Sequence, residues 1–409
     1  MIVLPRETPT GQRLLGVFAC ATVALAPIEG YLLAVHGQLA KLAPALLAVT
    51  WVVIRVRQRS LPRPHPVHAL LVLFAAVVLV STAVHVAEPF ALEYALRWLP
   101  FLVITAILVD VASREVPIAH LLVAAVAGAA VAGAGALYSL VAEGESRASG
   151  PLDDPNDLAH VLVAALPLLA PVVAARQPWV RGLAGVAGVV LVAGAAATFS
   201  RGGGLALAAA VGWLLVRKVL PLRVLAVACV AFAGLAVVGG LVAEQELTKA
   251  LQEKSFIAGT NVDTRELRWQ AAARILAEHP LLGVGPGEFR DEYPAASHNA
   301  EVDEQTPVAH NMYLEVAAEL GLPGFVVFLG LIATAVVASE RALRASADRR
   351  QMVAVQASLL GVAVTSTFLS EQYYLPLWLM IAVACAAEVR VRQVGTQSTK
   401  WEWECASCT

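Results

Sequence analysis

The feature that most constrains this chain is its series of long apolar runs, which are separated by short charged segments. Of the 409 residues, 58% are hydrophobic and only 15% are charged, whereas a soluble domain carries about 25% charged residues. A helix needs about 20 apolar residues to cross a bilayer, so the apolar runs are long enough for roughly twelve crossings. The composition predicts an all-α integral membrane protein, and it argues against a soluble enzyme, a fibrous protein or a disordered chain.

Reading the apolar runs against their charged flanks predicts about twelve transmembrane helices. The predicted spans are Leu14–Val35, Leu42–Ile54, Ala69–His85, Trp98–Ala112, Ala119–Val141, Leu158–Ala175, Gly182–Ser200, Gly202–Val216, Val224–Ala243, Leu322–Ala338, Met352–Leu369 and Pro376–Ala387. The chain is thereby divided into nine helices within residues 1–243, a loop over 244–312, three helices within 313–392, and a cytoplasmic tail over 393–409.

Lysine and arginine are distributed unevenly between the two sides of this map. With the N-terminus inside, 19 of the 29 Lys and Arg residues lie in cytoplasmic segments. Six others lie in the long loop, and long loops do not enter the positive-inside count. Only four remain outside, namely Lys41, Arg97, Arg147 and Arg201. The split predicts cytoplasmic termini and a long loop on the outer face.

The long loop, Glu244–Ala309, has 66 residues, and loops of this length are usually functional. Asp263 and Glu266 form a capping-box pattern, which predicts a helix that stops at His279–Pro280. A second helix is predicted to start near His310–Asn311 and to end at Gly321, with one apolar face. Such helices are expected to lie along the membrane surface above the bundle.

Three arginines are candidates for binding an anion. Arg201 sits at the outer junction of two predicted spans, before three glycines, and either contacts lipid headgroups or faces a cavity where it binds phosphate. Arg265 and Arg268 share one face of the first loop helix and either pair with Glu266 or Asp263 or bind the same anion. A guanidinium offers the donor fork that suits phosphate.

His310 is the candidate proton acceptor. At the start of a helix the dipole disfavours the imidazolium, so a neutral ring is expected there. The alternative is that His310 only caps the helix or lies on the surface. By contrast, the glycine-rich segment Gly283–Gly287 lacks a preceding strand and contains Pro286, so it is interpreted as a tight turn and not as a nucleotide loop.

An acidic turn precedes the sixth predicted span, and a helix N-cap with Asp154 and Asn156 is its ordinary interpretation. A Mg²⁺ or Mn²⁺ site is the alternative, and it needs additional carboxylates whose location the sequence leaves open. The candidates for those carboxylates are Glu88, Glu93 and Glu371. Cys405 and Cys408 in the tail form half of a zinc pattern without a second pair, so no metal is predicted.

Taken in order, several short motifs resemble the O-antigen ligase and polymerase superfamily of bacterial envelopes. They are Asp154-Pro155-Asn156-Asp157, Ser200-Arg201-Gly202, Arg265 four residues before Trp269, Glu278-His279-Pro280-Leu281-Leu282-Gly283-Val284-Gly285, His310-Asn311 followed by Tyr313-Leu314, and Gly321-Leu322-Pro323-Gly324. The resemblance covers most of the chain, and it favours the ligase branch without separating it cleanly from the polymerases.

The resemblance implies a GT-C-like glycosyltransferase of the bacterial inner membrane. Such an enzyme transfers a glycan (O-antigen) from undecaprenyl diphosphate to lipid A-core in lipopolysaccharide assembly, on the periplasmic side, with inversion and without a metal or other cofactor. The implied catalytic residues are His310, Arg265 and Arg201, with Arg268 as a further diphosphate ligand. Asp154, Asn156, Asn311 and Tyr313 would support them.

Three other functions stay open from the sequence. A polysaccharide polymerase uses the same donor with a growing glycan as acceptor, and a protein O-oligosaccharyl ligase uses a protein acceptor. A solute transporter predicts discontinuous helices with ions at the membrane midplane. Transport is disfavoured because the polar residues gather in an external loop.

Overall fold

The computed structural model describes residues 9–406 except 143, 146, 153, 174, 224–263, 302–305 and 346–347, with side chains from residue 10 to 393. The described residues form helices and turns and contain no strand. The chain is an all-α integral membrane protein, as the composition predicted.

The helical elements follow one another with short connections. They are α1 (Pro9–Leu25), η1 (Ala26–Ile28), α2 (Glu29–Val35), α3 (Leu39–Gln58), α4 (Pro66–Val84), α5 (Ala91–Arg114), α6 (Ile118–Ala142), α7 (Pro155–Ala165), η2 (Leu166–Leu169), α8 (Ala170–Val173), α9 (Pro178–Ala197), α10 (Arg201–Val216), α13 (Phe289–Ala296), α14 (Met312–Ala345), α15 (Arg349–Thr365) and α16 (Leu375–Ala406). Residues 264–278 form a further helix.

Eight described segments are long and apolar enough to cross a membrane. They are Thr10–Val35, Leu39–Gln58, Pro66–Val84, Ala91–Arg114, Ile118–Ala142, Pro155–Val173, Pro178–Ala197 and Met312–Ala345. Three more predicted spans coincide with α10, α15 and α16, whereas the predicted span Val224–Ala243 lies outside the described residues. The number twelve and the domain limits stay predictions, and α16 continues past residue 393 into the predicted tail.

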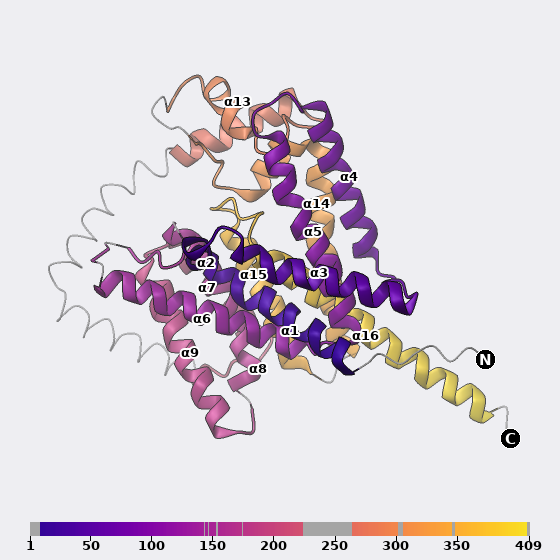
Figure 1. The fold of residues 1–409 in the computed structure, drawn as a ribbon. Helices are drawn as coiled ribbons and strands as arrows, with labels where there is room; N and C mark the ends of the chain where they lie inside the picture. The colour runs from indigo at the N-terminus through magenta and orange to yellow at the C-terminus, as the bar shows by residue number, and fades with distance from the viewer. Residues whose placement is uncertain are drawn as a thin grey trace.

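The helices pack around an aromatic centre. α16 packs against α5 and α14, α10 packs against α15, and α6 packs against α9. Trp98, Phe328 and Trp378 are fully buried, and each ring lies edge-on to the other two at centroid distances between 6.1 and 6.4 Å. Figure 1 shows α13 at one end of the bundle, beyond α4, α5 and α14. We call this the loop end, defined by residues 264–311.

The second predicted loop helix differs from the expectation. Residues 312–320 are the first part of α14, which continues to Ala345 across a break at Gly321 (φ 67°, ψ −174°). Both faces of this part are buried, including Val316 and Glu319. It therefore enters the bundle core and does not lie along the membrane surface. The first predicted helix is confirmed over residues 264–278, while its capping residue Asp263 lies outside the described residues.

The glycine-rich turn over Gly283–Gly287 is hydrogen-bonded to α14 next to the break at Gly321. Because Pro323 has no N–H group, the carbonyl of Glu319 is available and accepts the Gly285 N–H at 3.0 Å. The adjacent Ala318 carbonyl accepts the Val284 N–H at 3.1 Å. Gly285 has φ 109°, a conformation that favours glycine, so the tight-turn interpretation is confirmed.

The loop end has a small apolar core of its own, which fixes it on α14. Its buried members are Ala271, Ala272, Ile275, Val284, Phe289, Tyr293, Ala309 and Ala318. Ala271 and Ile275 belong to the predicted apolar stripe of the helix over 264–278. The loop end is therefore a packed cap and positions its polar side chains on a rigid support.

Candidate active site

The N-terminus of α7 contributes the first polar group of the site. Asp154 is its N-cap: one carboxylate oxygen accepts the Asn156 backbone N–H at 2.6 Å and the Asn156 side-chain amide at 2.9 Å. Asn156 in turn accepts a hydrogen bond from Arg147 at 3.1 Å. The predicted capping role of Asp154 is confirmed. Asp154 and Asn156, which were predicted to support the site, lie beside Arg147. The sequence identified Arg147 only as a positive charge on the outer side of the membrane.

Arg147 connects three chain segments. Its Nε donates to the Thr198 carbonyl at the end of α9 at 2.9 Å, in addition to the bond to Asn156. Burial lowers the pKa of Arg147, and the nearby carboxylate of Asp154 opposes that change. Two donor atoms therefore fix this guanidinium beside α7 while it keeps its charge.

Arg265 lies close enough to Arg147, Arg268 and Asp154 for their charges to affect its pKa. Burial lowers the pKa of Arg265, the positive charges of Arg268 and Arg147 lower it further, and Asp154 opposes them. Neither Arg265 nor Arg147 has a carboxylate oxygen within 4.0 Å among the described residues. Arg147 and Arg265, two guanidinium groups near the single carboxylate of Asp154, leave an excess of positive charge, which favours an anion.

Arg201 opens α10 at the same end of the bundle. Ser200 caps the helix by accepting the Gly203 N–H at 3.2 Å, and the Arg201 side chain is exposed. Gly202 lies so close to Phe368 that an added Cβ would be 3.2 Å from its ring, so the first turn of α10 packs on the loop between α15 and α16. Arg201 follows Thr198, the Arg147 contact, by three residues.

Arg268 has a different environment from the other arginines. Its Nε and Nη2 donate to the two carboxylate oxygens of Glu301, each at 3.0 Å, and the Arg268 residue is 7% exposed. Tyr293 also donates to Glu301, and burial raises the pKa of Tyr293 to about 12, so the phenol keeps its proton. Arg268 therefore has a partner, Glu301, that the sequence did not predict, while the predicted partner Asp263 lies outside the described residues.

His310 directly precedes the N-cap of α14 and is not the cap. Asn311 performs that role, because its side-chain oxygen accepts the N–H groups of Tyr313 at 3.1 Å and Leu314 at 3.2 Å. The Tyr313 hydroxyl donates to the Ala363 carbonyl at 2.9 Å, which ties α14 to α15. His310 itself is half-buried and has φ 47°, a left-handed conformation that is uncommon outside glycine.

The histidine and the Arg268 pair lie near each other. The hydrogen bond from Arg268 holds the pKa of Glu301 below its usual value, and the neighbouring His310 contributes in the same direction. The Arg268–Glu301 pair thus connects the helix over 264–278 to the segment that carries His310. The alternative that His310 is a helix cap is wrong, since Asn311 occupies that position.

Comparison with protein families gives a match over part of the chain. A family model described as O-antigen ligase matches residues 186–329, about a third of the chain. The match supports the O-antigen ligase superfamily. The matched segment contains Arg201, Arg265, Arg268 and His310. No curated protein matches the chain. The match indicates a multi-pass membrane enzyme of the O-antigen ligase type, and it does not separate the ligase branch from the polymerases.

Of the three carboxylates that the sequence offered for a metal site, Glu371 lies near the Asp154 turn. Glu371 is 1% exposed and pairs with Asp157, one turn into α7, and the Tyr374 hydroxyl donates to Asp157 at 2.8 Å. Burial raises the pKa of Glu371 well above its usual value, and the negative charge of Asp157 adds to this. A carboxyl group that keeps its proton acts as a hydrogen-bond donor, and Glu371 lies beside the Asp157 carboxylate, which can accept that bond.

The other two candidate carboxylates lie elsewhere. Glu88 lies with Glu288 and Asp291, with ligand atoms within 4.8 Å of one another, and Glu93 pairs with Arg97 on the surface of α5. A Glu288 oxygen accepts the Phe90 N–H at 2.7 Å, at the start of α5. Neither Glu88 nor Glu93 contacts the Asp154 turn.

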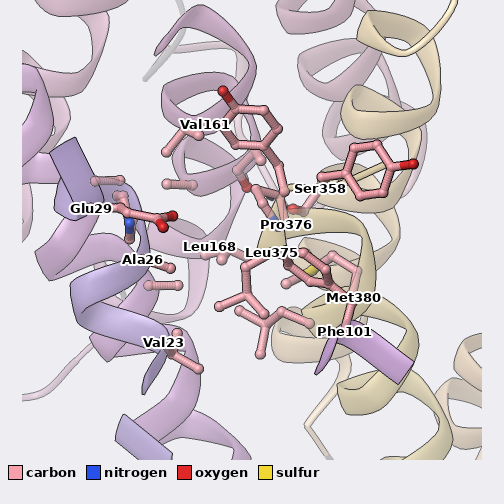
Figure 2. A pocket seen from close by; sticks show the side chains of 18 residues that line it. Val23, Ala26, Glu29, Phe101, Val161, Leu168, Ser358, Leu375, Pro376 and Met380 are labelled. Carbon is pink, nitrogen blue, oxygen red and sulfur yellow. Dashed lines mark hydrogen bonds between the residues drawn. The ribbon is translucent and has the colours of Figure 1, made fainter. Parts of the chain in front are cut away.

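An apolar cavity adjoins the same part of the ligase-type enzyme. It lies between η1, α7 and the start of α16, and Figure 2 shows Glu29 and Ala26 on one side and Leu375 and Pro376 on the other. Tyr374 lines this cavity and also holds Asp157, so the cavity lies next to the first turn of α7.

Proposed function

We propose that this chain transfers a glycan from undecaprenyl diphosphate to the lipid A-core oligosaccharide. The observation that carries the proposal is the group formed by Arg147 and Arg265, which has excess positive charge at the loop end, where His310 also lies. The family match supports a lipid-linked glycan as donor in general. The choice of lipid A-core as acceptor rests on the resemblance to the ligase branch.

The diphosphate of the donor is proposed to bind Arg265 and Arg201, with Arg147 as a further ligand. When the glycosyl–oxygen bond breaks, negative charge grows on the leaving diphosphate, and guanidiniums fixed in advance stabilise that charge without reorganisation. Arg268 keeps its predicted place in the site, but its bidentate bond to Glu301 favours a supporting role for it. The apolar cavity suits the isoprenoid chain.

His310 is proposed to accept the proton of the acceptor hydroxyl. The hydroxyl oxygen attacks the anomeric carbon, its proton goes to the imidazole, and the diphosphate leaves on its lipid. Direct displacement in one step inverts the anomeric centre. The carrier supplies the energy, so this reaction needs neither a nucleotide sugar nor ATP. That it needs no metal is implied by the resemblance to the ligase branch.

Transfer assays in nanodiscs test the proposal. The purified full chain is given a lipid-linked oligosaccharide and one of three acceptors: lipid A-core, a free glycan, or a pilin-type protein. Transfer to lipid A-core alone is the expected result. Glycan elongation identifies a polymerase, protein modification identifies a protein ligase, and the absence of transfer to every acceptor contradicts the proposed reaction.

The proposed location is the bacterial inner membrane with the site facing the periplasm, and it rests on the distribution of lysine and arginine. Two exposed positions at opposite ends of the map test it in a cysteine-free background. We expect an impermeant maleimide to modify Asn299→Cys in intact cells and to leave Arg350→Cys unmodified. Labelling of Arg350→Cys in sealed cells contradicts the orientation.

A further inference from the structure

Glu315 is a buried carboxylate that the mechanism above does not use. The residue is 3% exposed and lies in the first turn of α14. One of its oxygens accepts the Ala309 N–H at 2.9 Å and the Ser370 hydroxyl, and the other accepts the Gln372 side-chain amide at 2.7 Å. Glu315 therefore joins two chain segments that enter the site from different directions.

The first segment is the one that carries His310. A non-glycine residue with positive φ stores about 1–3 kcal/mol of strain and persists only where its surroundings hold it. On the C-terminal side of His310, Asn311 is fixed as the cap of α14. On the N-terminal side, Ala309 is fully buried and its N–H group is held by Glu315. The backbone of His310 is thus fixed on both sides.

The second segment leads to the arginines. Ser370 and Gln372 flank Glu371, which pairs with Asp157 in α7, the helix that Asp154 caps. Asn156, which donates to Asp154, accepts a hydrogen bond from Arg147, so a continuous set of contacts connects the His310 segment to a guanidinium group near the proposed diphosphate position.

We propose that Glu315 is a positioning residue, which holds the His310 backbone at a fixed place relative to the arginines. This inference rests on the proposed role of His310 as the base. A displacement of about 1 Å at a reacting group can lower a rate by roughly 10²-fold, so the hydrogen bonds of Glu315 act on turnover and not on donor binding.

Glutamine is an informative replacement for Glu315. A carboxylate accepts hydrogen bonds on both oxygens, whereas a glutamine side chain accepts on one atom and donates from the other. The Glu315→Gln variant keeps the size of the side chain but removes its negative charge and replaces one acceptor oxygen with a donor, which weakens the hydrogen bonds that Ala309, Ser370 and Gln372 donate to it. Glu319→Gln is the matched control, because Glu319 is 2% exposed, lies one turn further along α14 and holds the Gly287–Phe289 turn instead.

The experiment combines three measurements on the full chain in nanodiscs: turnover with lipid-linked oligosaccharide, affinity for that donor, and hydrogen exchange of the peptide over residues 306–311. For Glu315→Gln we expect turnover to fall by about 10- to 100-fold, donor affinity to stay within about twofold, and exchange to accelerate by at least about tenfold. For Glu319→Gln we expect turnover and exchange of this peptide within about threefold of wild type. In a His310→Asn background, Glu315→Gln should cause no further loss of turnover.

Each of the other outcomes contradicts a different step of the proposal. Unchanged exchange in Glu315→Gln overturns the backbone contact, and faster exchange with wild-type turnover overturns the positioning role. Wild-type turnover of His310→Asn alone overturns the proposed base, while the exchange data still test whether Glu315 holds the segment. If Glu315→Gln does not fold, Glu315→Asp replaces it, because aspartate keeps the carboxylate but is one methylene group shorter and so draws it away from the Ala309 N–H. Wild-type turnover together with wild-type exchange in that variant then overturns the proposal.

Discussion

The two ends of the helix bundle hold their buried and half-buried arginines in different ways. At the end opposite the loop, Arg55 is 5% exposed, and its guanidinium lies 2.6 Å from Asp110 and 2.7 Å from Glu115. At the loop end, Arg147 and Arg265 have no carboxylate at that distance among the described residues. Arg268, paired with Glu301, instead resembles the arrangement at the opposite end.

We interpret the difference as one between arginines that hold the fold and arginines that are proposed to bind a substrate. A buried guanidinium that a carboxylate already neutralises has little capacity left for a substrate anion, whereas one fixed by carbonyl or amide oxygens keeps its full positive charge. Arg55 belongs to the first group, and Arg147 belongs to the second because its partners are the Thr198 carbonyl and the Asn156 amide.

The largest effect is expected at the end opposite the loop. Asp110→Ala removes the carboxylate that lies near Arg55 and Arg114 and accepts from Trp51. Removal of one partner from a buried pair costs about 3–5 kcal/mol, so we expect a large fall in the melting temperature in detergent. Donor affinity of the folded fraction should stay at the wild-type value.

Glu93→Ala is the matched control, because Glu93 lies on the same helix and forms an exposed pair with Arg97. An exposed pair contributes about 0–1 kcal/mol, so its removal should barely change the melting temperature. If Asp110→Ala is as mild as Glu93→Ala, the distinction between the two ends of the bundle is wrong.

The second prediction concerns His310 and tests the chemistry at the loop end. Asparagine tolerates positive φ better than most residues and is no base at neutral pH, so His310→Asn keeps the backbone and removes the proton acceptor. We expect transfer to fall by roughly 10²-fold while donor affinity and melting temperature stay near wild type. Turnover and donor binding, measured on one nanodisc preparation, check both parts.

Because Asn311 already caps α14, asparagine at position 310 cannot restore activity through capping. An active His310→Asn enzyme would therefore remove the histidine from the mechanism. It would also leave the loop end with electrostatic catalysis by its arginines alone.

The sequence predicts the spans well because helix formation in a membrane follows from local apolar runs. The predicted Gly321 boundary also appears in the structure, as a break inside α14, since glycine followed by Pro323 disrupts the helix locally. The burial of residues 312–320 was not predictable, because Val316, Ala317 and Leu320 give the same apolar face on a surface helix and on a core helix.

Prediction of the site was limited because contacts between residues far apart in the sequence leave no local signal. Local motifs pointed to Arg201, Arg265 and His310, but no local signal shows that Arg268 binds Glu301, 33 residues later. Arg147 stands in a segment without a motif, and only the contact with Asn156 reveals its place. Pairings over long sequence separations depend on the packing of α7, α9 and the loop end.

The third prediction tests whether Arg265 and Arg201 bind the diphosphate through a donor fork. Lysine keeps the charge but loses the paired donors, so Arg265→Lys and Arg201→Lys should each weaken donor binding by about tenfold, nearly as much as alanine. Arg268→Lys should weaken it less and should instead destabilise the loop end, since Arg268 serves Glu301. Titration of nanodiscs with undecaprenyl diphosphate measures the three affinities, and equal losses for all three variants contradict the comparison.

The smallest expected effect is a pH dependence of the Arg268–Glu301 pair. The hydrogen bond that Arg268 donates to Glu301 holds the pKa of Glu301 below the ordinary value of 4.5. The pair therefore stabilises the loop end above about pH 4.5, and this contribution is lost as the pH falls through the lower pKa of the folded state. Hydrogen exchange of the peptide over 306–311 should accelerate by about fivefold between pH 5 and pH 3, after correction for intrinsic rates, as expected from about 1 kcal/mol for such a pair.

Glu301→Gln should show faster exchange already at pH 5 and a smaller further change in acid, because glutamine does not titrate. An equal acid response in both proteins would mean that another group controls the opening, and Arg268 would then not resemble the paired arginines of the opposite end.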